Sequence, residues 1–211
     1  MDGINASYLK KNSGKQCEDG LLKYDEMARK MLKPLYDDFG FTWLKNPTAE
    51  DFSIDFENGW RYKGVDFTFG TELEVLKWWY TKYPFNDWHG FLKKCECYHY
   101  TNSYYVQIMN PELYYHSMPL PQYQTLTDVQ LTNKGLIKNT KVCIAYFPMM
   151  DFSDCYKAKT KDGQDIYINP LSDAKIIPLK ALPMFIARHQ LFLRKIGWFD
   201  ELHELQQGMA S

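Results

Sequence analysis

The sequence contains no apolar run as long as a membrane span and no excess of positive charge. Its 25 Lys and Arg residues nearly balance 26 Asp and Glu residues, which gives a formal net charge of −1. This balance disfavours a protein that coats nucleic acid through a broadly basic surface, so any nucleic-acid site must be local. The first residues, MDGINASYLKKNSGKQ, lack the apolar core of a secretion signal. We therefore expect a cytoplasmic protein, or one packaged inside a particle, with no membrane association.

Paired cysteines and several common catalytic motifs are also missing. The sequence has five cysteines, which is an odd number: Cys17, Cys95, Cys97, Cys143 and Cys155. No two of them have CxxC spacing. Such a set is typical of reduced thiols in the cytosol. The local group Cys95, Cys97 and His99 lacks a fourth ligand, so a zinc site there is not favoured. The sequence contains no GxSxG, Walker, GxGxxG or HExxH motif, so no motif favours the enzyme classes that use them.

The composition is that of a globular protein with an unusual share of aromatic rings. Apolar residues make up 45% of the 211 positions and aromatic residues 17%, including 16 Tyr and 6 Trp. A chain of this length fits one domain, or a core domain with an elaborated tail. The rings either fill the core and general surface, or stack on bases and line an interface.

The first half of the chain alternates helical and strand-like patterns. Polar residues 1–20 predict a flexible N-terminal arm, and apolar residues at helical spacing predict an amphipathic helix over 21–38. The following elements are three strands over 52–56, 60–69 and 72–80, a helix over 88–100 and a strand over 103–109. Asn58–Gly59 and Gly70 mark the expected turns of the three-strand meander.

The second half begins with a Tyr-, Pro- and Gln-rich stretch that predicts an extended surface connection. A strand over 141–147, a hairpin turning at Asp162–Gly163 and a helix over 182–207 interrupted at Gly197 follow. The expected fold is therefore mixed α/β, with a central mixed sheet of about four strands flanked by helices. We expect residues 21–111 to form the core and residues 112–211 a C-terminal extension packed on it.

The stretch Gly64–Lys77, GVDFTFGTELEVLK, places acids inside apolar strand patterns. Because strand side chains alternate in direction, Asp66 should lie on the face opposite Val65 and Phe67. Burying a carboxylate costs free energy unless a cation or hydrogen-bond donors compensate its charge. A divalent metal ion would be such a cation. The other explanation is an exposed outer face, which acids prefer.

The order helix, three-strand meander, helix, strand, with these acids and a lysine on the second and third strands, resembles the PD-(D/E)XK nuclease superfamily over residues 21–109. The resemblance implies a metal-dependent nuclease, a hydrolase that cuts phosphodiester bonds in DNA. Asp66 and Glu74 would bind Mg²⁺ or Mn²⁺, and Lys77 would assist the attacking water. Glu26 would be the first-helix acid, and Lys93 or Lys94 the group from the second helix.

One departure from the family pattern concerns the lysine. The family has one residue between its glutamate and lysine, whereas Glu74 and Lys77 are separated by two, which sends them to opposite faces of a regular strand. Either a bulge restores the alignment or the site is altered. The alternative function is therefore a catalytically inactive version of this fold, or an unrelated α/β protein, that binds protein partners through aromatic surface. Such a module would suit a phage or bacterial accessory factor in the host cytoplasm, and a homodimer is compatible with either function.

Overall fold

The computed structural model describes residues 21–45, 56–76, 79, 82–110, 140–150, 156–159, 163, 165–169 and 174–210. The helices and strands are α2 (Leu21–Phe39), β1 (Thr42–Lys45), β2 (Phe56–Tyr62), β3 (Val65–Leu76), β4 (Trp88–Phe91), α3 (Leu92–Tyr98), β5 (Ser103–Met109), β6 (Lys141–Tyr146), β7 (Tyr156–Lys159), β8 (Asp165–Asn169), β9 (Ala174–Pro178), α7 (Leu182–Lys195) and α8 (Trp198–Ala210). Short 3₁₀ turns occupy Phe147–Met149 (η2) and Leu179–Ala181 (η4). The predicted arm over 1–20 and the connection over 112–130 lie outside the described residues.

A mixed six-stranded sheet organises the fold, in the order β1-β2-β3-β5-β6-β9. The neighbours β3 and β5 are parallel, and every other adjacent pair is antiparallel. A parallel pair needs a crossover connection, which here contains β4 and α3. The predicted mixed α/β fold with a central mixed sheet is confirmed, and β6 and β9 of the C-terminal half extend the sheet. The strands of the meander differ from those predicted: β1 was not predicted, and β2 and β3 turn inside the predicted strand over 60–69, while residues 52–55 lie outside the described residues.

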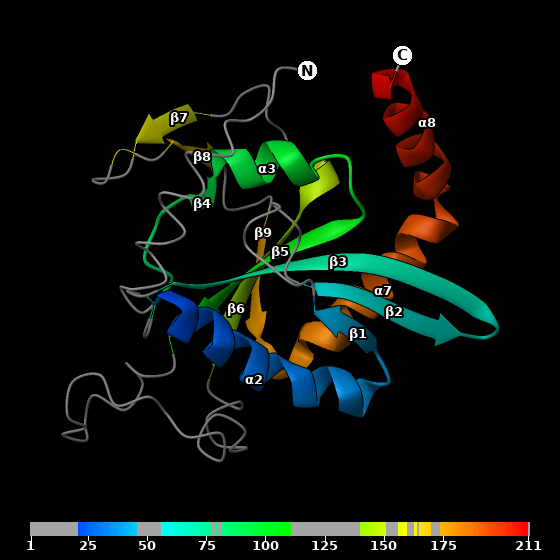
Figure 1. Ribbon diagram of the computed structural model, residues 1–211, viewed down its shortest axis with the longest axis horizontal. Helices are drawn as coiled ribbons and strands as arrows, with labels where there is room; N and C mark the ends of the chain where they lie inside the picture. The colour runs from blue at the N-terminus through cyan, green and yellow to red at the C-terminus, as the bar shows by residue number, and fades with distance from the viewer. Residues whose placement is uncertain are drawn as a thin grey trace.

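Helices cover the two faces of this sheet unequally (Figure 1). On one face, α2 and α7 pack with apolar side chains of β3, β5 and β6 into the larger core, which includes Met31, Leu73, Val106 and Ile186. On the other face, α3 and the small sheet β4-β8-β7 enclose a second core around Trp79, Trp88 and Tyr105. Residues from both predicted segments therefore share the same sheets, because β6 pairs with β5 and β8 pairs with β4. Within the described residues, no helix combines the length and apolar character needed to span a bilayer.

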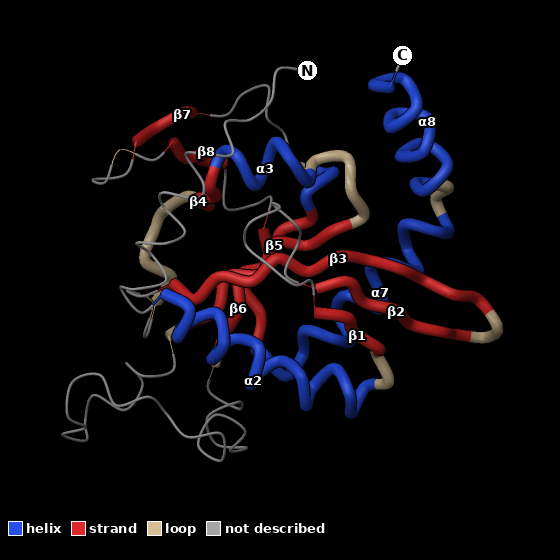
Figure 2. Tube along the Cα trace, viewed as in Figure 1, coloured by secondary structure: helices blue, strands red, loops and turns tan. Residues whose placement is uncertain are grey.

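The turns of the meander differ from those that the sequence predicts. The β2–β3 hairpin turns at Lys63 and Gly64, whose φ angles of 50° and 78° suit a tight two-residue turn. Asn58 and Gly59 instead lie inside β2, and Gly70 lies inside β3, so the predicted turns there are wrong (Figure 2). The Asn58 amide oxygen accepts a buried hydrogen bond from Thr71, 2.6 Å away. A Cβ atom at Gly59 would lie 2.6 Å from the Thr42 hydroxyl, so this glycine permits close packing of β1 on β2.

The ends of the other elements follow the predictions more closely. Strands over 103–109 and 141–146 form as expected, and β7 and β8 pair antiparallel around Gly163. Gly197, with a φ of 76°, separates α7 from α8 at the predicted break. The predicted helix over 88–100 begins only at Leu92, since residues 88–91 pair with β8 as strand β4.

A buried hydrogen-bond network attaches α7 to the sheet. The Gln190 amide nitrogen donates to the Asn102 amide oxygen at 3.0 Å and to the Tyr104 hydroxyl at 2.7 Å. The Tyr146 hydroxyl donates to the same Asn102 oxygen. The Tyr104 hydroxyl lies 2.8 Å from Nδ1 of His189. Such a network stabilises one position of the helix because an unsatisfied buried group would cost about 1–3 kcal/mol.

This network predicts an acid-sensitive attachment of α7. Burial lowers the pKa of His189 to about 4, below the value of about 6.5 in an unfolded chain. The unfolded state therefore binds the extra proton between these values, so this contribution to stability is complete above about pH 6.5 and is lost as the pH falls toward 4. We expect the urea midpoint to fall more steeply over this interval in the wild type than in His189→Gln. Equal pH slopes for the two proteins would contradict the burial of a neutral imidazole.

Candidate functional site

Two carboxylates occupy alternate positions of β3 and point to the face that α3 covers. Glu72 is buried and Glu74 is half-buried. The intervening Leu73 and the following Val75 point to the opposite face, where they join the larger core. Acids in the interior of a sheet need compensating partners, and each glutamate has them.

Glu72 is paired with a lysine from the crossover helix. The amine of Lys94, on α3, forms an ion pair with Glu72 Oε1, with side-chain exposures of 34% and 5% respectively. The same amine lies 5.9 Å from the ring centre of Tyr105, the residue that faces Glu72 across the β3–β5 pair. The pair thus connects α3 to the parallel strands beneath it.

Glu74 is held by side chains from β5. The Tyr105 hydroxyl donates a hydrogen bond to Glu74 Oε2, and the Gln107 amide nitrogen lies 3.4 Å from the same oxygen. Gln107 is itself oriented, because it donates to the His89 carbonyl at 2.6 Å and accepts from the Tyr83 hydroxyl at 2.7 Å. Burial, followed by the charge of Glu74, raises the pKa of Tyr105, so this phenol remains a hydrogen-bond donor at neutral pH.

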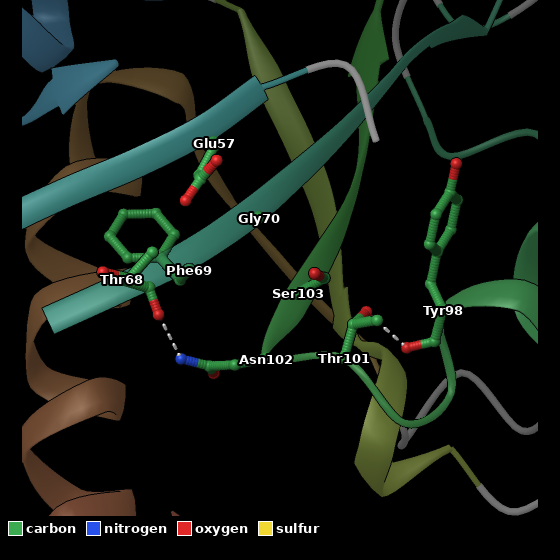
Figure 3. A pocket seen from close by; sticks show the side chains of 8 residues that line it. All are labelled: Glu57, Thr68, Phe69, Gly70, Tyr98, Thr101, Asn102 and Ser103. Atoms are coloured by element: carbon green, nitrogen blue, oxygen red, sulfur yellow. Dashed lines mark hydrogen bonds between the residues drawn. The ribbon is translucent and has the colours of Figure 1, made fainter. Parts of the chain in front are cut away.

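A pocket of about 270 Å³ opens between β3 and the loop that leads from α3 to β5. It is lined by Glu57, Thr68, Phe69, Gly70, Tyr98, Thr101, Asn102 and Ser103. Gly70 precedes Glu72 by two residues on the same strand face, and Tyr98 follows Lys94 by one helical turn. Figure 3 shows Asn102 crossing to β3, where its amide nitrogen donates to the Thr68 carbonyl at 2.6 Å. Glu72, Glu74 and Lys94 do not line this pocket, whose nearest residue to Glu72 on the same strand face is Gly70.

The structure does not bring the predicted metal ligands Asp66 and Glu74 together. Both lie on the continuous strand β3, eight residues apart, which is about 26 Å at the usual rise of about 3.3 Å per residue. The prediction that they share one metal ion is therefore wrong, because it required a turn at Gly70. Asp66 is exposed near the hairpin end and forms an ion pair with Arg61 on β2, at 2.9 Å.

The other predicted site residues have different outcomes. Lys77 lies outside the described residues, so its role stays a prediction. Glu26 falls in α2, and its side chain is not among those described; α2 itself packs on the face opposite Glu72 and Glu74. Of the two lysines proposed for the second helix, Lys94 reaches the acids.

Glu72, Tyr105 and Gln107 are members of the candidate site that the sequence patterns did not predict. A spacing of two residues between Glu72 and Glu74 was the available signal, since it places both on one strand face. The roles of Tyr105 and Gln107 depend on the parallel pairing of β3 with β5, which places Gln107 directly opposite Glu74.

Carboxylate oxygens, such as those of Glu72 and Glu74, are the ligands that a hard divalent cation prefers. Among the described residues, no group of three or more His, Cys, Asp and Glu side chains converges as a metal site. Mg²⁺ is commonly bound through one or two carboxylates and several waters. Glu72 and Glu74 would provide the carboxylates. A closed, all-protein cage, such as structural zinc requires, does not fit these residues.

Comparison with known proteins identifies no relative. No family model matches the chain, and neither the curated proteins nor the solved structures contain a significant match.

Removing Lys94 should destabilise the fold measurably. Lys94→Met leaves the Glu72 carboxylate buried without its cation, so we expect the free energy of unfolding to fall by about 1–3 kcal/mol. Lys33→Met is the matched control, because its ion pair with Asp37 is exposed on α2 and should contribute less than about 1 kcal/mol. Urea unfolding near pH 7 measures both, and a double variant with Glu72→Gln should recover much of the loss. Equal effects of the two single variants would contradict a structural role for the buried pair.

Proposed function

We propose that this chain is a metal-dependent nuclease-like protein that hydrolyses phosphodiester bonds in DNA, with its site at Glu72, Glu74 and Lys94. The observation that carries the proposal is the side-by-side placement of two carboxylates on one face of β3, with a lysine of the crossover helix against them. The element order is similar to the one on which the resemblance to the PD-(D/E)XK superfamily was based, with a helix, an antiparallel meander, a helix and a parallel strand, although the short strand β4 precedes the second helix and both Asp66 and Glu74 fall on β3. A cytoplasmic location belongs to the same proposal.

In this proposal the acid pair replaces the predicted combination of Asp66 and Glu74. Glu72 and Glu74 would hold Mg²⁺ or Mn²⁺ through their carboxylate oxygens. The bound cation would supply positive charge that stabilises the negative charge developing on the phosphate during hydrolysis. The pocket that includes Gly70 lies on the same face of β3 as the carboxylates, and a phosphate bound there would have to shift along the strand to reach them.

Lys94 has two roles in this proposal. Its ion pair holds the Glu72 carboxylate against α3 in the absence of substrate. Its amine is partly exposed, so it can also contact a phosphate oxygen that enters from the pocket. A lysine placed on a helix instead of on the strand would account for the departure at Glu74 and Lys77.

Tyr105 and Gln107 act as positioning residues. Both donate to the same oxygen of Glu74, which leaves the second oxygen, Oε1, for other partners. Preorganised carboxylates lower the cost of assembling the site when substrate binds.

The second candidate function is protein binding without catalysis, which an exposed apolar surface favours. Met184 and Phe192 on α7, and Ile196 directly after it, are each between 46% and 52% exposed. Exposed large apolar side chains mark interaction surfaces in many proteins when they form a patch. In this case Glu72 and Glu74 would serve only to fix α3 on the sheet.

A cleavage assay distinguishes the two functions and the two sets of acids. We expect wild-type protein to cut supercoiled, linear or branched DNA in Mg²⁺ or Mn²⁺, and we expect Glu72→Gln and Glu74→Gln to lose at least about 100-fold in rate, or about 2.7 kcal/mol. Asp66→Asn is the matched control, since it removes only an exposed ion pair far along the strand. Its rate should stay within about threefold of wild type.

The contradicting outcomes are specific. No cleavage by the wild type would leave only the protein-binding function. Equal cleavage by the wild type and both glutamine variants would remove Glu72 and Glu74 from the site. Loss of cleavage in Asp66→Asn alone would restore the assignment made from the sequence and remove Glu72 from the site.

A further inference from the structure

A second and larger pocket lies on the opposite side of the sheet from the acid pair, between β9 and α7. Its volume is about 450 Å³, and its lining residues are Ile177, Ala181, Met184, Phe185, Arg188 and His189. Volumes of about 300–1,000 Å³ with mostly apolar walls and few polar groups are typical of small-molecule sites. Four of the six lining side chains are apolar, so the two polar ones determine what kind of ligand fits.

Hydrogen bonding fixes which nitrogen of His189 carries the proton. The Tyr104 hydroxyl accepts a hydrogen bond from Gln190, so its single hydrogen is free to point to Nδ1 of His189. Nδ1 is therefore the acceptor and Nε2 carries the proton. Because Nδ1 points to the buried phenol, Nε2–H lies on the side of the ring away from Tyr104.

The imidazole remains neutral across the physiological pH range. Burial lowers the pKa of His189 to about 4. The titratable groups packed against the ring are the phenols of Tyr104 on β5 and Tyr146 on β6. Burial raises the pKa of both phenols, so neither carries charge near pH 7. His189 thus offers the pocket a neutral hydrogen-bond donor and no charge.

Arg188 supplies the charge. Its side chain is exposed and lines the pocket one residue before His189. In the described part of the chain, no carboxylate forms an ion pair with its guanidinium; the described ion pairs use Lys33, Arg61 and Lys94. Arg188 carries the charge and the paired N–H donors that bind carboxylates well, and His189 lines the same pocket one residue further along α7.

We propose that the groove between β9 and α7 binds a small organic acid, with its carboxylate on Arg188 and His189 and its aromatic or branched aliphatic body against Ile177, Met184 and Phe185. The apolar walls of the groove favour a ligand with a ring or a branched chain. The guanidinium of Arg188, the one cationic group in the described lining, favours a ligand with one negative charge. The site is independent of the proposed nuclease function, since it lies on the other face of the sheet and shares no residue with the acid pair.

The test uses naphthalene-1-acetate as the probe and its neutral analogue naphthalene-1-acetamide, each titrated into the full chain at pH 7 by calorimetry. We expect saturable binding of the acetate with a Kd below about 1 mM, and binding of the acetamide at least about tenfold weaker. Arg188→Met should weaken acetate binding at least about tenfold, whereas Lys195→Met, an equal loss of charge in the last turn of the same helix, should leave it within about twofold. Glu72→Gln should bind the acetate as the wild type does.

A second variant tests the groove itself. Ala181→Trp places a large ring in the pocket, so acetate binding should be lost while the urea midpoint stays close to that of the wild type. Absence of acetate binding by the wild type would overturn the proposal. Equal affinity for acetate and acetamide, equal weakening by Arg188→Met and Lys195→Met, or undiminished binding to Ala181→Trp in a folded protein would each overturn it as well.

Discussion

The ion pair between Glu72 and Lys94 is the described charged contact between the central sheet and the crossover helix on one of its faces. It joins the middle of β3 to α3, the helix through which the chain crosses before it returns as β5. Because β3 and β5 are parallel, the chain between them has to cross over one face of the sheet. The ion pair connects α3, which lies in this crossover, to β3. The position of α3 then determines the pocket beside Gly70 and the second core around Trp88.

The same face combines features that stabilise the fold with features suited to chemistry. Glu74 is oriented by Tyr105 and Gln107, so its carboxylate is placed before any ligand arrives. Buried charged pairs often cost stability relative to apolar substitutes, and they are retained where a defined arrangement or a function needs them. The opposite face carries mostly apolar contacts with α2 and α7, and the described polar network there connects α7 to β5 and β6.

Much of the fold could be predicted from local patterns in the sequence. The helix from Leu21, the strands over 103–109 and 141–146, the hairpin at Gly163 and the break at Gly197 depend on periodicity and on glycines with positive φ. The meander turns failed because Asn58–Gly59 has the composition of a turn, while its actual role is packing against Thr42 and Thr71. The site was predicted less well. Asp66 and Glu72 look alike within the strand pattern, and only Lys94 and Tyr105, both distant in the sequence, distinguish the buried acid from the exposed one.

The central claim is that Glu72 and Glu74 act together on a divalent cation. Its most direct test is the affinity for Mn²⁺, measured by electron paramagnetic resonance of the free ion during titration of the full chain. The account predicts one bound Mn²⁺ per chain for the wild type and for Asp66→Asn, and a loss of at least about tenfold in affinity for Glu72→Gln and Glu74→Gln. Unchanged Mn²⁺ affinity in both glutamine variants, or a wild-type chain that binds no Mn²⁺, would contradict it.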